Sequence, residues 1–401
     1  MKIDESRNVF ARPAAVFVAP FLEAMEERVR ALPGLAEAER AVVRSALADA
    51  LSLNAQLRLN RLFLLELHAA GLTGQLTASD EQQRWAQFIE LACTPAFSEH
   101  LRRRYPTLHG RVDTVLRQQL DAVLTLVERF AADRPLFASL PGQPGGALRA
   151  LSLGAGDTHR GGQSVTRLEL ERGTVMYKPR SMEVDVALSR VLEHLLPDAP
   201  EAERIRVPHV LLREGYGWAE FVAHRYCEGE DELRRFYRHL GHWLALMRLL
   251  GGTDLHSENL IAHGPVPVAV DVESLFAQDA AVPPSGRGEA VDIAAATIRD
   301  TVLRTGLLPI RGAGLALAGV DFSAVGALPG QQPRIPMPVI LDAGSDTARL
   351  GMTSMELPPA GNHPSPRPVL ERYWDQIVVG FRELTEHLQA LDARRSLTER
   401  L

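Results

Sequence analysis

The sequence predicts an α+β fold in which a helical N-terminal region precedes a β-rich segment and a second helical segment. Apolar residues recur at helical spacing up to residue 133, and short alternating or β-branched runs follow. Long amphipathic segments then return from residue 231. Hydrophobic residues make up 46% of the chain and charged residues 23%. These are ordinary values for globular domains and argue against extensive disorder.

The N-terminal helical region is predicted over residues 1–138. Pro33-Gly34 ends its first helical segment, and Ser79 with Gln82 fits a capping box at the start of a later one. No cluster of catalytic residue types falls here, so we expect a bundle core or a docking surface. The helical segments expected are Phe17–Leu32, Leu53–Leu67, Trp85–Leu91 and Asp113–Phe130.

A β-rich nucleotide-binding lobe is predicted over residues 147–230. The Pro- and Gly-containing stretch 139–146 breaks the helical pattern, which places a domain boundary there. A helix is expected over Val184–Leu196, between the second and third strands. The expected strands are Gln163–Leu170, Thr174–Tyr177, Arg206–Leu212 and Tyr216–Val222.

A helical catalytic lobe is predicted over residues 231–401. Its helices are expected at 231–250, Asp292–Thr305 and Leu370–Ala390. Residues 310–369 are rich in Pro and Gly and are expected to form a long irregular insert near the substrate cleft. Such inserts in compact domains are usually functional or mobile loops.

Charge, cysteine content and hydropathy narrow the class of protein. The formal net charge of −6 disfavours nucleic acid as a partner, because nucleic-acid binders usually carry a basic face. Cys93 and Cys227 are the only cysteines, too few for a disulfide framework or a cysteine-based zinc site. No signal peptide is recognisable, and no segment reaches the roughly 20 apolar residues of a membrane span. We therefore expect a soluble cytoplasmic protein.

An Asp-to-Asn interval carries the strongest chemical signal. Asp254 follows the helix expected at 231–250, Asn259 comes five residues later, and Asp271 ends a short apolar strand. In phosphoryl transfer from Mg-ATP, one carboxylate accepts the proton of the attacking hydroxyl, while an amide oxygen and a second carboxylate bind Mg²⁺. Protein kinases use the same interval. The sequence therefore predicts a kinase-like two-lobed catalytic domain that uses ATP and Mg²⁺.

Two neighbouring residues are assigned with alternatives. His256 either stabilises the loop or contacts phosphate, and a histidine that is simply packed against the loop is an equal alternative. Glu273 falls on the same side of the strand as Asp271 by the two-residue period and is a candidate ligand of a second metal. A structural acceptor is the alternative for Glu273.

Lys178 is the predicted phosphate-binding lysine. It ends an apolar strand in the small lobe, and we assign it and Arg180 to the nucleotide phosphates. An edge-strand surface lysine is the alternative, and the downstream acidic residues in kinase order favour the functional role. Asp185 and Glu193, on the following helix, are both candidates for the carboxylate partner of Lys178.

A glycine-rich loop precedes the first predicted strand. Glycines at this position would let the backbone approach phosphates closely, and a hairpin without a ligand is the alternative. The loop is not a Walker loop, because no Gly-Lys-Ser/Thr follows. Asp157, His159 and Arg160 add charge and proton-transfer capacity, which a plain turn does not need. We assign Asp157 and His159 to catalysis, and Arg160, Gly161 and Gly162 to cofactor binding.

Several motifs together carry a family resemblance that runs from about residue 15 nearly to the C-terminus. They are GDTHRGGQSV (156–165), YKPRS (177–181), YGWAEF (216–221), GGTDLHSENLIAHG (251–264), VDVESLF (270–276) and LRTGLLP (303–309). In combination they resemble the dehydratase domain of class II lanthipeptide synthetases, the LanM family. That domain is lipid-kinase-like. It phosphorylates Ser and Thr of a ribosomal precursor peptide and then eliminates phosphate to give dehydroalanine and dehydrobutyrine.

The resemblance also implies roles for single residues. Lys178, Asp254, His256, Asn259 and Asp271 match the family's phosphorylation residues, and Asp157 and His159 match the motif near the phosphate. The family's Arg-Pro-Thr-like elimination segment does not occur between Asp271 and Leu401, and the C-terminal zinc cyclase is missing. We therefore expect a fragment of a longer enzyme, one part of a split enzyme that acts with a separate cyclase, or a stand-alone kinase-like protein.

Two other functions fit part of the pattern. Asp-Leu-His-x-x-Asn also occurs in antibiotic and choline kinases, which makes a small-molecule phosphotransferase the alternative enzyme. A catalytically incomplete synthetase that binds the leader peptide as a scaffold is the non-enzymatic alternative. The retained Lys178, Asp254, Asn259 and Asp271 argue against the scaffold, and the absent elimination segment argues for it.

Overall fold

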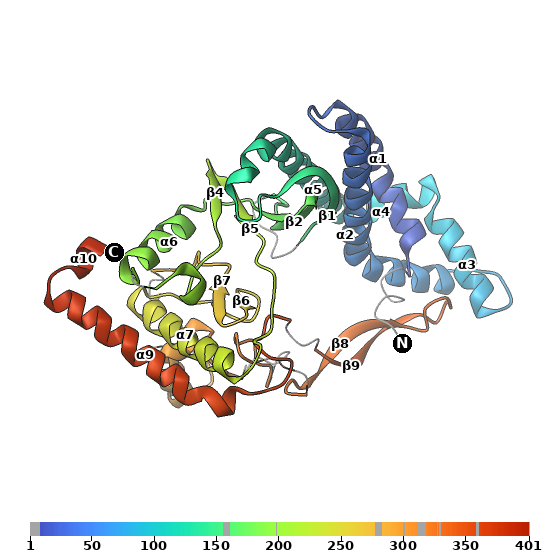
Figure 1. Ribbon diagram of the computed structural model, residues 1–401. Coiled ribbons are helices and arrows are strands. Elements are labelled where there is room, and N and C mark those ends of the chain that lie inside the picture. The colour runs from blue at the N-terminus through green and yellow to red at the C-terminus, as the bar shows by residue number, and fades with distance from the viewer. Residues whose placement is uncertain are drawn as a thin grey trace. The chain divides into compact units, whose positions relative to one another are not determined.

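Helices and strands divide between two compact units in a computed structural model of the chain (Figure 1). The structure describes residues 9–154, 161–197, 199–276, 283–299, 301–311, 318–326, 328, 330–357 and 361–400. The first unit comprises residues 1–180, 215–219 and 336–354, and the second comprises 181–214, 220–335 and 355–401. None of the described helices combines the length and apolar character needed to cross a membrane.

The first unit begins with helices that pack on one another through apolar stripes. Phe10, Phe63 and Phe88 are fully buried where α1, α2 and α3 meet. Asp80, rather than the predicted Ser79, caps α3, because its carboxylate accepts a hydrogen bond from Gln83 N at 2.7 Å. The helices are α1 (Ala11–Ala31), α2 (Glu37–Leu72), α3 (Glu81–Ala92), α4 (Pro95–Arg104) and α5 (Pro106–Asp133), followed by the 3₁₀ helix η2 (Arg134–Ser139).

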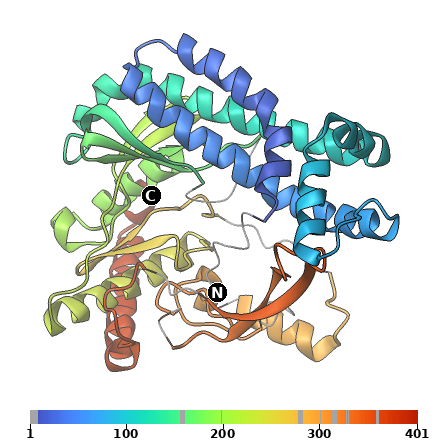
Figure 2. The same ribbon diagram turned by 90° about the vertical axis from the view of Figure 1, so that its right-hand side faces the viewer.

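A sheet completes the first unit and lies against these helices, with β1 packed on α2 (Figure 2). The strands of this sheet that belong to the first unit follow the order β1-β2-β3-β5, and the β1–β2 and β2–β3 pairs are antiparallel. The register pairs Thr166 with Tyr177. The strands are β1 (Gly145–Ser152), β2 (Thr166–Arg172), β3 (Thr174–Lys178) and β5 (Tyr216–Glu220).

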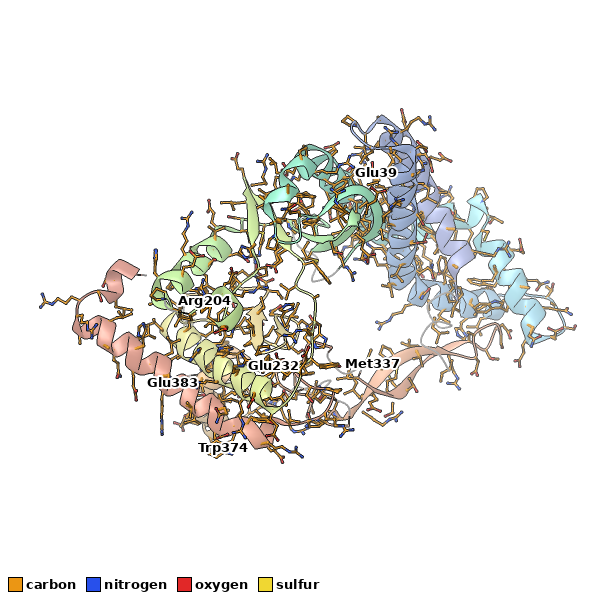
Figure 3. The ribbon with its side chains drawn as sticks, viewed as in Figure 1. Glu39, Arg204, Glu232, Met337, Trp374 and Glu383 are labelled. Atoms are coloured by element: carbon orange, nitrogen blue, oxygen red, sulfur yellow. The ribbon has the colours of Figure 1, made fainter. Side chains whose placement is uncertain are left out.

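The domain boundary predicted at 139–146 is wrong, because one compact unit runs through this stretch. Buried Glu39, at the start of α2, joins the helices to the sheet across this stretch (Figure 3). Its carboxylate accepts hydrogen bonds from Leu148 N in β1 at 2.8 Å and from the Arg134 guanidinium at 2.7 Å. A buried carboxylate must keep such partners, so the helices and the sheet form one folding unit.

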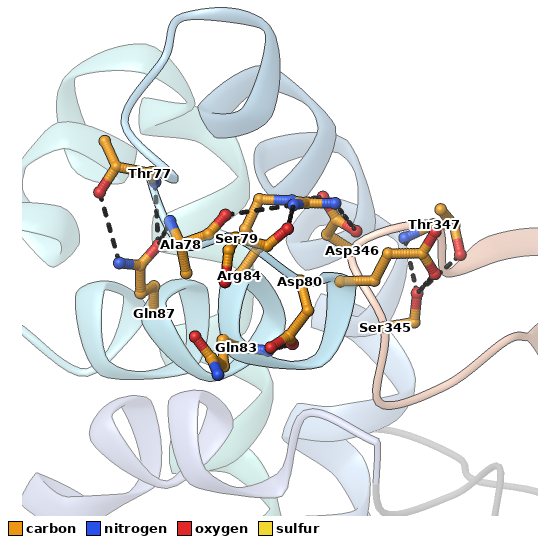
Figure 4. Close-up of polar contacts among 11 residues, drawn as sticks. Thr77, Ala78, Ser79, Asp80, Gln83, Arg84, Gln87, Ser345, Asp346 and Thr347 are labelled. Carbon is orange, nitrogen blue, oxygen red and sulfur yellow. Dashed lines mark hydrogen bonds and ion pairs between the residues drawn. The ribbon is translucent and has the colours of Figure 1, made fainter.

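The sequence predicted an irregular insert over residues 310–369. This prediction is wrong for part of the range. Strands β8 (Arg334–Leu341) and β9 (Arg349–Glu356) form a two-stranded sheet within this range. The tip of this hairpin is held at the start of α3 (Figure 4), where the Arg84 guanidinium contacts both carboxylate oxygens of Asp346, at 2.5 and 3.3 Å. Two-stranded sheets are marginal alone, so this ion pair anchors the hairpin.

The second unit is built around α7 and α9, which cross closely (Figure 1). Leu240, Leu244, Ile377 and Leu384 belong to its buried core. The helix predicted at 292–305 ends earlier, at Arg299, and a separate 3₁₀ turn covers the end of that range. The elements are α6 (Glu183–Leu195), η3 (Glu201–Glu203), β4 (Val210–Arg213), α7 (Glu230–Leu249), β6 (Leu260–His263), β7 (Val266–Ala269), α8 (Glu289–Arg299), η4 (Val302–Thr305), α9 (Leu370–Ala393) and α10 (Leu397–Arg400).

Candidate active site

The loop after α7 presents Asp254 to solvent. Asp254 has a positive φ of 65°, a conformation that Asp and Asn tolerate better than most residues. Its neighbours fix the backbone on both sides, since Thr253 N donates to Ser274 O at 3.3 Å and Leu255 N to Thr305 O at 2.8 Å. Leu255 is fully buried, whereas the Asp254 side chain is 62% exposed. The fold therefore holds this carboxylate outward on an anchored loop.

His256 is oriented by its own loop. Glu258 N donates to His256 Nδ1 at 3.2 Å, which leaves the proton of the neutral ring on Nε2. Nε2 lies 3.5 Å from Asp254 Oδ1. The ring is therefore placed where it can stabilise the loop and orient the Asp254 carboxylate.

Asn259 closes the loop. Its side-chain amide nitrogen donates to Asp254 O at 2.8 Å, and its backbone N donates to His256 O at 3.0 Å. Because the amide nitrogen is used inside the loop, the side-chain oxygen is the atom available as a metal ligand. The Asn259 side chain is thus hydrogen-bonded to the Asp254 backbone.

The β6–β7 hairpin carries the chain from Asn259 to Asp271. Leu260 pairs with Ala269, and Val270 N donates to Asn259 O at 2.9 Å. Asn259 and Asp271 therefore come to the same end of the hairpin. Asp271 lies two residues beyond the end of β7, rather than at the end of the strand as the sequence predicted. The premise for Glu273 is wrong, because β7 ends at Ala269 and Glu273 lies exposed in a turn rather than on a shared strand face.

The donor set at this end of the hairpin fits Mg²⁺. One carboxylate and one amide oxygen are hard oxygen ligands, and Mg²⁺ is usually held by one or two carboxylates together with substrate phosphates. In the described part of the chain, no three His, Cys, Asp or Glu side chains gather into a metal cage. Asn259 and Asp271 suit an ion that arrives with nucleotide phosphates.

Four residues from later in the chain support the loop. Gly306 and Ser274 lie in motifs already noted in the sequence, whereas nothing in the sequence pointed to Phe322 or Asn362. Ser257 N donates to Phe322 O at 2.9 Å, and the Asn362 amide donates to Ser257 O at 3.1 Å. Gly306, in the LRTGLLP motif, lies so close that an added Cβ would be 3.1 Å from His256 N. The side-chain hydroxyl of Ser274 also donates a hydrogen bond to Thr253 O. These partners lie 21 to 105 residues from the residues they contact.

Lys178 and Arg180 lie at the end of β3, in the first unit. Lys178 is the last residue of the strand and is buried, and half-buried Arg180 follows in a bend. A surface lysine on an edge strand is therefore the wrong description of Lys178. Of the two carboxylates considered as its partner, Asp185 is buried on α6 and Glu193 is exposed.

The described part of the glycine-rich loop is Gly161 and Gly162, and Asp157, His159 and Arg160 lie outside the described residues. Both glycines have positive φ values, of 74° and 87°. A Cβ on Gly162 would be 3.0 Å from the backbone of Gln118 in α5. Packing against α5 is thus a sufficient reason for this glycine, independent of phosphate binding.

His363 makes the second unit sensitive to acid. Burial, reinforced by neighbouring His224, lowers the pKa of His363 to about 4, whereas an unfolded histidine has a pKa of about 6.5. The unfolded chain therefore binds more protons between these values. The free energy of unfolding is expected to fall, by about 3 kcal/mol from this group, as pH drops from about 6.5 to 4.

Urea unfolding at several pH values between 7 and 4 tests whether His363 lowers the free energy of unfolding in acid. His363→Gln should show a flatter decline than the parent chain across the window. His242, whose pKa burial also lowers to about 4, keeps part of the slope in the variant. Parallel curves for the two proteins would contradict the assignment to His363.

Comparisons with known proteins agree on one family. The family described as a domain of unknown function, DUF4135, matches residues 105–400. The lacticin 481/lactococcin biosynthesis protein LcnDR2 of Lactococcus lactis subsp. lactis is 24% identical over 268 residues, which cover 65% of this chain and 29% of that protein. The chain thus matches less than a third of the length of this relative.

Proposed function

Because this chain belongs to the DUF4135 family and is of the LanM type, we propose that it phosphorylates Ser and Thr of a ribosomal precursor peptide with ATP. The phosphorylation would be the first step of dehydration in lanthipeptide biosynthesis. The observation that carries the proposal is the anchored loop, which exposes Asp254 and joins it to Asn259. The relative's role in lacticin 481 biosynthesis supports a peptide as the acceptor.

Each residue has a part in the proposed transfer. The Asp254 carboxylate accepts the proton of the substrate hydroxyl. The hydroxyl oxygen bonds to the γ-phosphorus of ATP, and the bond between that phosphorus and the bridging oxygen breaks, so that ADP leaves. His256 holds that carboxylate in orientation from 3.5 Å. Lys178 neutralises charge on the nucleotide phosphates. Asn259 and Asp271 would hold Mg²⁺, which offsets the charge that develops on the phosphates.

A kinase-like arrangement is part of the proposal. The order of the elements supports it: a strand that ends in buried Lys178, helix α7, the Asp254 loop, the β6–β7 hairpin and then Asp271. This is the order in which protein kinases present their lysine, catalytic aspartate, amide and metal-binding aspartate.

Mass spectrometry of a peptide substrate tests the function. After incubation with Mg-ATP, a lacticin-481-type precursor peptide should gain ~80 Da for each phosphate transferred. If elimination follows, the readout becomes a loss of ~18 Da per dehydrated residue, because the phosphate then leaves with the hydroxyl oxygen. Unchanged peptide, with phosphate transferred to choline or an aminoglycoside instead, would select the small-molecule alternative. Peptide binding without any transfer would select the scaffold.

A further inference from the structure

The last turns of α5 carry a polar and aromatic cluster against the sheet, which we call the α5 clamp: Arg129, Asp133, Tyr177, Tyr216 and Trp218. Asp133 is 1% exposed, and its Oδ2 accepts hydrogen bonds from the Tyr216 hydroxyl at 2.7 Å and from Trp218 Nε1 at 2.9 Å. One buried carboxylate oxygen thus fixes two side chains of β5.

Arg129 connects the clamp to β3. Its guanidinium donates to the Tyr177 hydroxyl and lies 4.0 Å from the centre of the Tyr216 ring. The Tyr177 ring in turn packs 5.1 Å from the Trp218 ring, and Tyr177 is 2% exposed. A charge-assisted hydrogen bond in such a buried setting specifies one position for the strand, which apolar packing alone would not do.

Tyr177 is the residue directly before Lys178. Side chains alternate along a strand, so Tyr177 projects toward α5 and Lys178 projects from the opposite face of the sheet. Because Arg129 holds the Tyr177 hydroxyl and Trp218 packs on its ring, the Tyr177 side chain restrains the backbone at the end of β3 next to Lys178. The clamp therefore sets the position from which the lysine side chain starts.

We propose that Arg129 is a positioning residue for nucleotide binding, which acts on Lys178 by holding Tyr177 in place. The proposal rests on the proposed function, since it takes Lys178 as a ligand of the nucleotide phosphates. It also gives α5 a part in nucleotide binding, where the sequence indicated only a bundle core or a docking surface for the N-terminal helices.

The test measures affinity for Mg-ATP by calorimetry, together with KM for ATP and kcat. Arg129→Met keeps the aliphatic length of the side chain but removes its charge and donors. It is expected to weaken Mg-ATP binding about tenfold and to raise KM for ATP more than it lowers kcat. Tyr177→Phe, which removes only the hydroxyl, should produce a similar loss, and Arg129→Lys should restore part of it.

Two controls separate positioning from general stability. Arg134→Met removes a guanidinium one turn further along, which bonds to Glu39 and to Gly34 O rather than to β3. It should lower Tm without changing Mg-ATP affinity. In a Lys178→Ala background, Arg129→Met should cause no further loss of affinity, because residues that act through one another are non-additive.

Distinct outcomes overturn the clamp and the proposed function. Parent-like affinity for Mg-ATP in both Arg129→Met and Tyr177→Phe overturns the clamp alone. The clamp is also overturned if Arg129→Met weakens Mg-ATP binding equally in the parent chain and in the Lys178→Ala background. A parent chain that binds no Mg-ATP and leaves the precursor peptide unchanged overturns the proposed function, and the clamp with it.

Discussion

Replacing Asp254 by asparagine is expected to slow peptide phosphorylation by about 10²–10⁴-fold, the range that a general base contributes. The substitution keeps the shape of the side chain and removes its ability to accept a proton. Asn tolerates the positive φ of 65° as well as Asp does, so the loop should keep its conformation. Transfer of phosphate to the precursor peptide is measured by mass spectrometry, with Tm as the check on folding.

Asp342→Asn is the matched control for this variant. Asp342 also has a positive φ, of 54°, and its side chain is 51% exposed, but it lies at the tip of the β8–β9 hairpin, paired with Arg349. Activity equal to that of the parent chain is expected. Retained phosphorylation in Asp254→Asn would remove Asp254 from the role of base. A large drop in its Tm would instead point to a structural role.

Replacing Gly380 by alanine is expected to destabilise the second unit by about 3 kcal/mol or more, because it overpacks the α7–α9 crossing. A Cβ on Gly380 would lie 1.9 Å from Arg238 O, and one on Gly241 would lie 2.2 Å from Ile377 O. Both contacts are with backbone, which cannot move aside as a flexible side chain can. Since α7 leads into the Asp254 loop, activity should fall together with stability.

Urea unfolding measures this effect as a lower midpoint at unchanged slope. Gly110→Ala provides the control, because Gly110 lies within α5 and a Cβ there would meet nothing within 4 Å. That variant should be unchanged or more stable by about 0.5–1 kcal/mol, as alanine is the better helix former. If Gly380→Ala unfolded at the midpoint of the parent chain, the two helices could not cross as closely as described.

Local patterns in the sequence were sufficient for much of the second unit. The apolar period predicted α7 and α9 almost to their ends, and the interval from Asp254 to Asn259 predicted the loop and the hairpin that follows. These features depend on contacts between residues close in sequence. Asp80 rather than Ser79 caps α3 because the helix begins one residue later than the capping box predicted, at Glu81, so Gln83 N is the donor to be satisfied.

The supports of the loop could not be predicted in the same way. Asn362 reaches Ser257 across 105 residues, and a lone asparagine in a Pro-rich stretch looks like any turn residue. The β8–β9 hairpin was hidden for a related reason. Its two prolines, Pro336 and Pro338, argue against a strand, yet β8 forms in a two-stranded sheet, where each strand has an open edge.

The interleaving of the two units along the chain has a consequence for how the protein is made. Trp218, which packs on Phe130 and Phe137, leaves the ribosome long after those two side chains. The hairpin tip that contacts Arg84 follows only at Asp346, when most of the second unit has already been synthesised. Domains usually fold in order from the N-terminus during translation. Here the first unit cannot complete its sheet or its hairpin contact until residues 215–219 and 336–354, which lie between stretches of the second unit in the sequence, have been synthesised.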